Sequence, residues 1–165
     1  MDFFTDVLSM LEDIYCDFNH FFYRLGNTPI FSLNSKEEYS RAAEHILPAD
    51  TQNKEEGIET LATWLETKYR HRLEEEGSTN DQDRRDRMSK VNPKFILRQW
   101  VLQEVIENTK SETEVGVQDK KLLDHVLKMA LEPFKDEWGG DMGEEARFCG
   151  DVPKRDRGFQ CSCSS

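Results

Sequence analysis

Apolar residues recur every three or four positions through most of this chain, and this helical spacing constrains its fold more than any other feature. In residues 57–76 they line one side of a helix, at Ile58, Leu61, Leu65, Tyr69 and Leu73. The same spacing predicts helices over residues 2–15, 17–26, 35–47, 81–90, 93–109 and 118–131. No stretch alternates apolar and polar residues as a half-buried strand does. We therefore expect a mainly α fold.

Residues that favour helix starts support several of these boundaries. Asp17 is a suitable N-cap for the second helix. Ser35-Lys36-Glu37-Glu38 forms a capping box, with Ser at the N-cap and Glu three positions later. Asn92-Pro93 offers an N-cap followed by Pro at the first helical position. Because the helix over 93–109 is apolar around much of its circumference, we expect it to be the most buried one.

The composition changes after the last predicted helix. Pro133 ends that helix, and from there to Ser165 the chain is enriched in Gly, Asp, Pro, Arg and Cys. We expect residues 1–132 to form one helical region. Residues 133–165 are expected to be an extended, Cys-containing tail with little regular structure.

Charge and the length of the apolar runs argue against two classes of partner, nucleic acids and membranes. The 33 acidic and 22 basic residues give a net charge of −11, which disfavours nucleic-acid binding because phosphate contacts need clustered Lys and Arg. The one basic stretch, Arg84-Arg85-Asp86-Arg87, is predicted to be a solvated helix face, as are acidic pairs such as Glu37-Glu38 and Glu55-Glu56. No apolar run reaches the ~18 residues that a membrane span needs, so no membrane partner is expected.

Four cysteines, Cys16, Cys149, Cys161 and Cys163, are too few for a disulfide scaffold and favour a reducing compartment. The terminal carboxylate disfavours a Cys163 thiolate, whereas the basic residues from Lys154 to Arg157 favour it, so the direction of its pKa shift stays open. A metal site using the last three cysteines and a histidine is a weak alternative. Their spacing matches no zinc ribbon, and the histidines are scattered, at His20, His45, His71 and His125.

Two segments resemble a known family. Arg87–Trp100, followed by Gln103–Glu107, is similar to an R-M-x-x-V-N-P-x-x-x-L-R-N-x-x-x-Q-x-A-I stretch, and the chain ends in Cys161-Ser162-Cys163-Ser164-Ser165. Both are typical of the selenoprotein O family of protein adenylyltransferases. Its members end in C-S-S, some animal members carry selenocysteine at the position of Cys163, and the doubled C-S-C-S-S ending resembles the fungal branch.

Weaker similarities follow in the same order. Asp17–Leu25 resembles the family's D-[FY]-T-x-x-F-R-x-L, Trp64–Arg72 its W-L-x-x-Y-x-x-R, and Glu132-Pro133-Phe134 its N-P-[FY]. The chain departs from bacterial members near its end, where Cys149–Pro153 replaces a P-P-x-W segment. In residues 27–56 and 111–118 we identify no motif of the family.

The resemblance implies the C-terminal portion of a protein-kinase-like (pseudokinase) fold. Family members transfer AMP from ATP to Ser, Thr or Tyr hydroxyls of proteins and use Mg²⁺. That chemistry needs a Gly-rich phosphate cradle and metal-binding acids, yet the only adjacent glycines are Gly139-Gly140, and there is no D-F-G. We therefore assign no catalytic, cofactor-binding or metal residue, expect no cofactor for this chain alone, and expect it to be inactive without a missing kinase-like core.

The resemblance also implies a redox role for Cys163 and Cys161, because a selenocysteine counterpart points to chalcogen chemistry. The two cysteines could close a strained C-x-C disulfide, or one could pair with a cysteine of the missing core and regulate activity. Mitochondrial localisation is implied in the same way, although Met1–Asp6 resembles no presequence and the chain alone would be cytoplasmic. Two readings stay open beside this one: a stand-alone acidic helical interaction module, and a small thiol redox protein.

Overall fold

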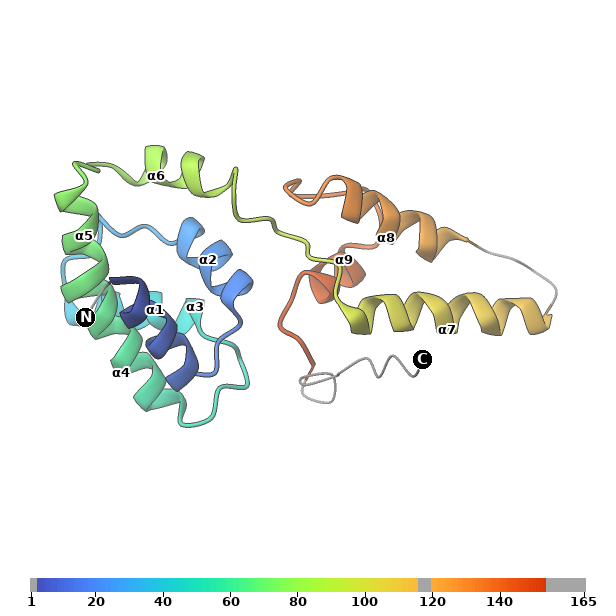
Figure 1. Cartoon of the computed structure of the whole chain (residues 1–165), viewed down its shortest axis with the longest axis horizontal. Helices are drawn as coiled ribbons and strands as arrows, with labels where there is room; N and C mark the ends of the chain where they lie inside the picture. The colour runs from blue at the N-terminus through green and yellow to red at the C-terminus, as the bar shows by residue number, and fades with distance from the viewer. Residues whose placement is uncertain (1–2, 116–119, 154–165) are drawn as a thin grey trace. The chain divides into compact units, whose positions relative to one another are not determined.

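The structure, a computed structural model, describes residues 3–115 and 120–153, and for residues 110–115 it describes the backbone alone. The described residues form helices and no strand, which confirms the mainly α prediction. They fall into two compact units, Met1–Asn92 and Pro93–Ser165 (Figure 1). The boundary between the units lies after Asn92. The boundary predicted from the sequence, between a helical region and a tail, lies after residue 132.

Six α-helices and one π-helical segment follow one another in the described part of unit 1. They are α1 (Phe3–Asp13), α2 (Phe18–Asn27), α3 (Lys36–Ile46), α4 (Lys54–Trp64), η1 (Leu65–Tyr69), α5 (Arg70–Glu75) and α6 (Asp81–Met88). Their apolar sides enclose a single core, whose fully buried members include Phe21, Leu25, Ile46, Leu61 and Leu65.

The predicted caps of α2 and α3 are confirmed. The Asp17 carboxylate accepts the His20 amide at 3.0 Å. At the start of α3 the Ser35 hydroxyl accepts the Glu38 amide at 3.3 Å, and the Glu38 carboxylate accepts the Ser35 amide at 3.1 Å, which completes the capping box. Each bond satisfies an amide that the first turn of a helix leaves without a partner.

The predicted helix over 57–76 is present and continues from α4 through η1 to α5. Its inward-facing residues, from Leu61 to Leu73, are spaced four apart, so in a regular helix they would drift by about 120° around the axis. The π turn closes with the Arg70 amide bonded to the Leu65 carbonyl, one residue beyond the usual partner. This wider turn restores the register, and Leu65 and Tyr69 are both buried.

Aromatic residues near the N-terminus divide between core and surface. Phe21 is fully buried and meets the Trp64 ring edge-on at 5.9 Å, while Trp64 stacks on Tyr69 at 5.2 Å. Phe4 and Phe18 are exposed. The aromatic residues of α1 and α2 therefore lie only partly in the core.

Unit 2 contains α7 (Gln99–Val115), α8 (Lys121–Leu131) and α9 (Met142–Phe148). Figure 1 shows α7 and α8 side by side and antiparallel. Their shared core is formed by Phe95, Trp100, Val101, Val105, Val126, Met129, Trp138 and Phe148.

The predicted start of α7 at Asn92-Pro93 is wrong, because the helix begins six residues later, at Gln99. Asn92 instead ends the preceding helix: its amide and its side-chain Nδ2 donate to the Met88 carbonyl at 2.9 and 3.0 Å. The Lys94 and Phe95 amides donate to the Pro133 carbonyl at 2.9 and 3.1 Å, so a tertiary contact replaces a helical turn.

Residues 133–153 also differ from the prediction of little regular structure. They include the helix α9, and Trp138 and Phe148 are among the most buried side chains of unit 2. Asp141 caps α9, its carboxylate accepting the Glu144 amide at 2.8 Å. The prediction that α7 would be the most buried helix is wrong as well, because Leu102 and Ile106 are exposed.

Candidate functional site

The most buried charged group among the described residues of unit 1 is Arg84 in α6, at 2% exposure. Its Nε lies 3.2 Å from Asp81 Oδ1, and its Nη1 donates to the Leu25 carbonyl at 3.0 Å. A further bond runs from Nη2 to the Thr28 carbonyl. The prediction of a solvated face is thus wrong for Arg84, although Arg85, Asp86 and Arg87 are exposed.

Asp81 connects this network to the loop between α2 and α3. Its two carboxylate oxygens accept the Ile30 and Phe31 amides at 2.8 and 2.9 Å. Tyr69 closes the other side, with its hydroxyl 3.4 Å from Arg84 Nη1, and burial raises the pKa of Tyr69 despite the opposing charge of Arg84. A buried ion pair with its remaining groups hydrogen-bonded holds helices and loops in place.

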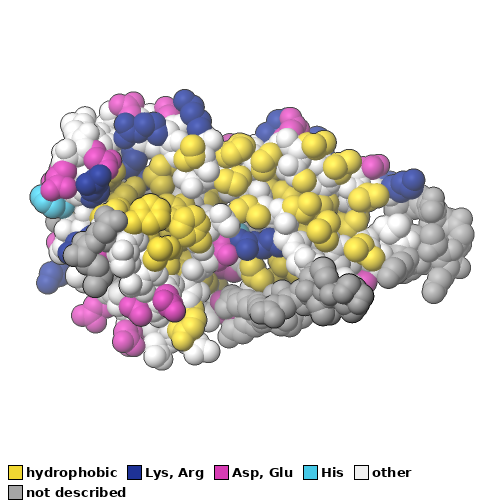
Figure 2. All heavy atoms as spheres, viewed as in Figure 1, with side chains coloured by type: hydrophobic (Ala, Val, Ile, Leu, Met, Phe, Trp, Pro, Cys, Tyr) yellow, Lys and Arg dark blue, Asp and Glu magenta, His cyan; other side chains and the backbone are white. Residues whose placement is uncertain are grey.

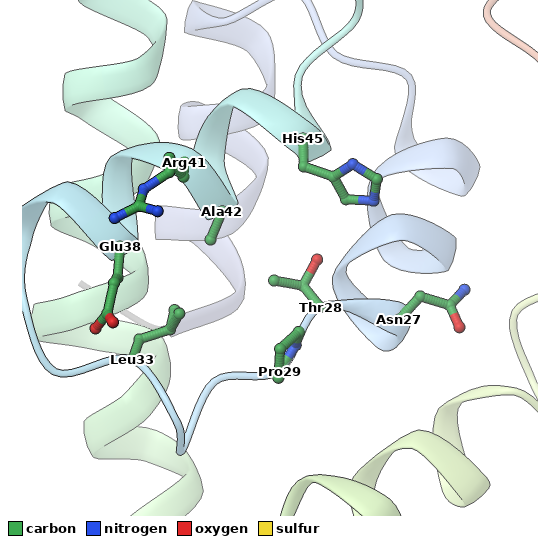
Figure 3. Close-up of a pocket in the computed structure, with 8 residues that line it drawn as sticks. All are labelled: Asn27, Thr28, Pro29, Leu33, Glu38, Arg41, Ala42 and His45. Carbon is green, nitrogen blue, oxygen red and sulfur yellow. The ribbon is translucent and has the colours of Figure 1, made fainter.

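The loop that Asp81 holds forms one wall of a pocket of about 330 Å³ (Figure 3). The pocket lies between the end of α2, this loop and α3. It is lined by Asn27, Thr28, Pro29, Leu33, Glu38, Arg41, Ala42 and His45. The mixture of apolar and polar groups suits a small polar ligand or a side chain of another protein.

The lining residues of the pocket do not form a catalytic set. The Thr28 hydroxyl donates to the Arg24 carbonyl at 2.8 Å, and this bond satisfies a carbonyl in the last turn of α2. Hydrogen bonds from the Asn34 and Ser35 amides lower the pKa of Glu38, whose carboxylate belongs to the capping box. A catalytic hydroxyl needs a base beside it that accepts its proton. The Thr28 hydroxyl and the Glu38 carboxylate are not paired in this way, because each is bonded to the backbone of its own segment.

In unit 2 a buried carboxylate, Glu145 of α9, organises the turn before its own helix. It accepts the Gly140 amide at 2.9 Å and the Trp138 amide at 3.2 Å, and it lies 3.2 Å from His125 Nε2. Burial alone would raise the pKa of Glu145, but these amides and the charge of His125 outweigh it, so the pKa is lowered. A Cβ placed on Gly140 would clash with the His125 ring, so either the turn or the ring would have to move.

The two cysteines predicted to be redox-active, Cys161 and Cys163, lie outside the described residues. Cys149 is partly buried in unit 2, and burial raises its pKa to about 11. At neutral pH its thiol is therefore protonated and a poor nucleophile. In unit 1 the Cys16 Sγ lies 3.8 Å from the Asp17 carbonyl oxygen.

The described residues offer little support for a metal site. They include no group of three or more His, Cys, Asp and Glu placed to bind an ion. The four histidines stay apart: His20 is buried, His45 lines the pocket, His71 pairs with Glu75, and His125 pairs with Glu145. None of the helices that the structure describes has the length and apolar character to cross a membrane.

Comparison with known proteins gives the family. The family model of the protein adenylyltransferase SelO matches residues 1–128. The mitochondrial protein adenylyltransferase SelO of Schizosaccharomyces pombe is 35% identical over 167 residues, an alignment covering 98% of this chain and 27% of that protein. The protein nucleotidyltransferase YdiU of Myxococcus xanthus is 31% identical over 161 residues, covering 98% of this chain and 28% of that protein.

No solved structure matches the chain. The chain spans just over a quarter of the length of these curated relatives. The family model nevertheless matches well over half of the chain, and relatives from fungi and bacteria match almost all of it. The chain belongs to the SelO family of protein adenylyltransferases.

Proposed function

We propose that this chain is the C-terminal, helical part of a SelO-type protein adenylyltransferase. In this proposal a kinase-like core outside the chain binds ATP and Mg²⁺ and transfers AMP to protein hydroxyls, and the chain alone is inactive. The observation that carries the proposal is the alignment itself: 98% of the chain matches 27% of a protein named as a protein adenylyltransferase.

The described residues are suited to a structural role. Magnesium prefers carboxylate oxygens that are open to it. The oxygens of Asp81 accept two loop amides and contact Arg84, and those of Glu145 accept the Trp138 and Gly140 amides. Because these two buried acids are committed to internal bonds, they are not open to a magnesium ion, and we assign no step of the reaction to them.

The proposal includes a redox-regulatory tail and a mitochondrial location. Cys163 and Cys161 would form a disulfide with each other or with the core. Cys149 is a poor partner for them, because a thiol with a pKa of about 11 forms little of the thiolate that disulfide exchange needs. The name of the S. pombe relative, a mitochondrial SelO, supports the location.

Nucleotide binding tests this proposal. Titration of a fluorescent ATP analogue with Mg²⁺ into the purified chain should give no saturable binding in the millimolar range. The S. pombe relative, titrated in parallel, should bind. Saturable, ATP-competed binding to the chain alone would contradict the assignment of the nucleotide site to a part outside it.

A further inference from the structure

Helix α8 carries apolar residues on two adjoining sides, and only one side is buried. Val126 and Met129 belong to the core of unit 2. Leu123, Leu127 and Leu131 follow at intervals of four, so they share one side of the helix, and they are 41%, 52% and 73% exposed. An apolar stripe ~100° wide is usual for a surface helix, and α8 exceeds it.

Helix α7 shows the same pattern. Val101 and Val105 are buried, while Leu102 and Ile106, one position further along, are 39% and 45% exposed. These two residues are four apart and share a side of α7. Each helix of the α7–α8 hairpin therefore has an exposed apolar edge next to its buried stripe.

The two edges lie on the same face of the hairpin, because α9 covers the opposite face. Arg147 of α9 pairs with Glu104 and lies over the Trp100 ring, 5.7 Å from its centroid. Glu145 of α9 contacts His125 of α8. Each contact thus identifies the side of α7 or α8 that faces α9.

The exposed residues lie on the far side of both helices. At about 100° per residue, Leu102 is turned about 200° from Trp100, and Leu127 is turned about 200° from His125. Figure 2 shows hydrophobic side chains gathered on the face of unit 2 turned towards the viewer. We call the five exposed apolar residues on the side of α7 and α8 away from α9 the hairpin face: Leu102, Ile106, Leu123, Leu127 and Leu131.

We propose that the hairpin face is the surface by which this segment docks onto the remainder of a SelO-family protein. This inference rests on the proposed function. The S. pombe relative contains the matching segment in a polypeptide of which it makes up 27%, so almost three quarters of that protein lies outside it. A contiguous apolar face of this kind marks an interaction site.

Covalent linkage favours the remainder of the SelO-family protein, rather than a second copy of this chain, as the partner of the hairpin face. Within one polypeptide the remainder of the protein is present at an effective concentration in the millimolar range, ~10⁻³ M, without any need for a second molecule. The occupant is therefore an apolar surface of the family's larger part. Self-association through the same five residues is the competing outcome.

Co-purification tests the docking surface. A tagged copy of this chain is co-expressed with the part of S. pombe SelO outside the aligned segment, so that neither piece has to fold alone. Leu127→Glu puts a charge at the centre of the hairpin face. Met142→Glu is the matched control: Met142 is 75% exposed, on α9, and a glutamate in a first helical turn is tolerated.

We expect the unaltered chain and the Met142→Glu variant to retain the S. pombe part, and the Leu127→Glu variant to bind it at least tenfold more weakly. Circular dichroism checks that both variants keep their helices. Equal binding by Leu127→Glu and the unaltered chain would overturn the proposal. So would a dimer in sedimentation velocity that Leu127→Glu dissociates and the S. pombe part does not displace.

A chimera separates the failure of this inference from the failure of the proposed function. The chimera is S. pombe SelO with its matching segment replaced by this chain. AMP transfer by the chimera, unaffected by Leu127→Glu, would support the proposed function and refute the docking face. A complex that depends on Leu127 but transfers no AMP would support the docking face and count against the function.

Discussion

Arg84 and Asp81 form an ion pair, 3.2 Å between Nε and Oδ1, that ties three separate segments of unit 1 together. Asp81 receives the Ile30 and Phe31 amides, and Arg84 donates to the Leu25 carbonyl. The pair therefore links α6 to the end of α2 and to the loop lining the pocket. Removing Asp81 would leave the buried Arg84 guanidinium without its counter-ion, and removing Arg84 would leave the Leu25 carbonyl without its donor.

Arg84→Ala should lower the free energy of unfolding of unit 1 by about 3–5 kcal/mol, the usual effect of breaking a buried pair. Arg85→Ala is the matched control, because Arg85 is exposed on the same helix, and a change of about 0.5 kcal/mol or less is expected there. Chemical denaturation followed by circular dichroism measures both. Equal stability of the two variants would show that the network contributes nothing.

Gly140→Ala should destabilise unit 2, because the added Cβ would lie 2.2 Å from His125 Cε1 and either the turn or the ring must move. The cost should be about 1–3 kcal/mol, as for other overpacked sites. Truncating the ring relieves the clash, so the double variant with His125→Ala should lose less stability than the sum of the two single variants. Strict additivity in this double-mutant cycle would rule out the contact.

Unit 2 should lose stability in acid through Glu145. Its folded-state pKa is lowered from 4.5, so folding stabilises the ionised form of the Glu145 carboxylate. That contribution is fully present above pH 4.5 and is lost as the pH falls through the folded-state pKa. Thermal melts from pH 7 down to pH 3 should show a steeper decline for the unaltered chain than for Glu145→Gln. Parallel declines would contradict the prediction.

Cys149 should be alkylated slowly in the folded chain. A rise of its pKa from 9.0 to about 11 lowers the thiolate fraction at neutral pH about 100-fold. Iodoacetamide labelling, followed peptide by peptide by mass spectrometry, should therefore be about 100-fold slower at Cys149 in the native chain than in urea. Equal rates in both conditions would show an exposed, ordinary thiol.

Local sequence signals predicted much of the fold. The Asp17 cap and the Ser35–Glu38 capping box depend on side chains within four residues of the amides they bind, so the sequence alone identifies them. The prediction that α7 starts at Asn92-Pro93 was wrong because the same two residues also suit the end of a helix. The Pro133 carbonyl, 39 positions after Lys94, decides the outcome there, and no local pattern shows it.

The candidate site was less predictable for the same reason. Arg84 stands among charged residues, and its burial depends on Leu25 and Thr28, more than 50 positions away. One local signal was present: Asp81 and Met88 lie three positions before and four after Arg84, on one side of α6. The helix α9 was missed because its seven residues are too few to establish a period.

The central claim, that this chain is a non-catalytic part of an adenylyltransferase, is tested most directly by label transfer. ATP labelled on its α-phosphate is incubated with Mg²⁺ and a protein acceptor, together with either the purified chain or the chimera that contains it. We expect no protein labelling by the chain and clear labelling by the chimera. Labelling by the chain alone would contradict the account and place the catalytic residues within these 165 residues.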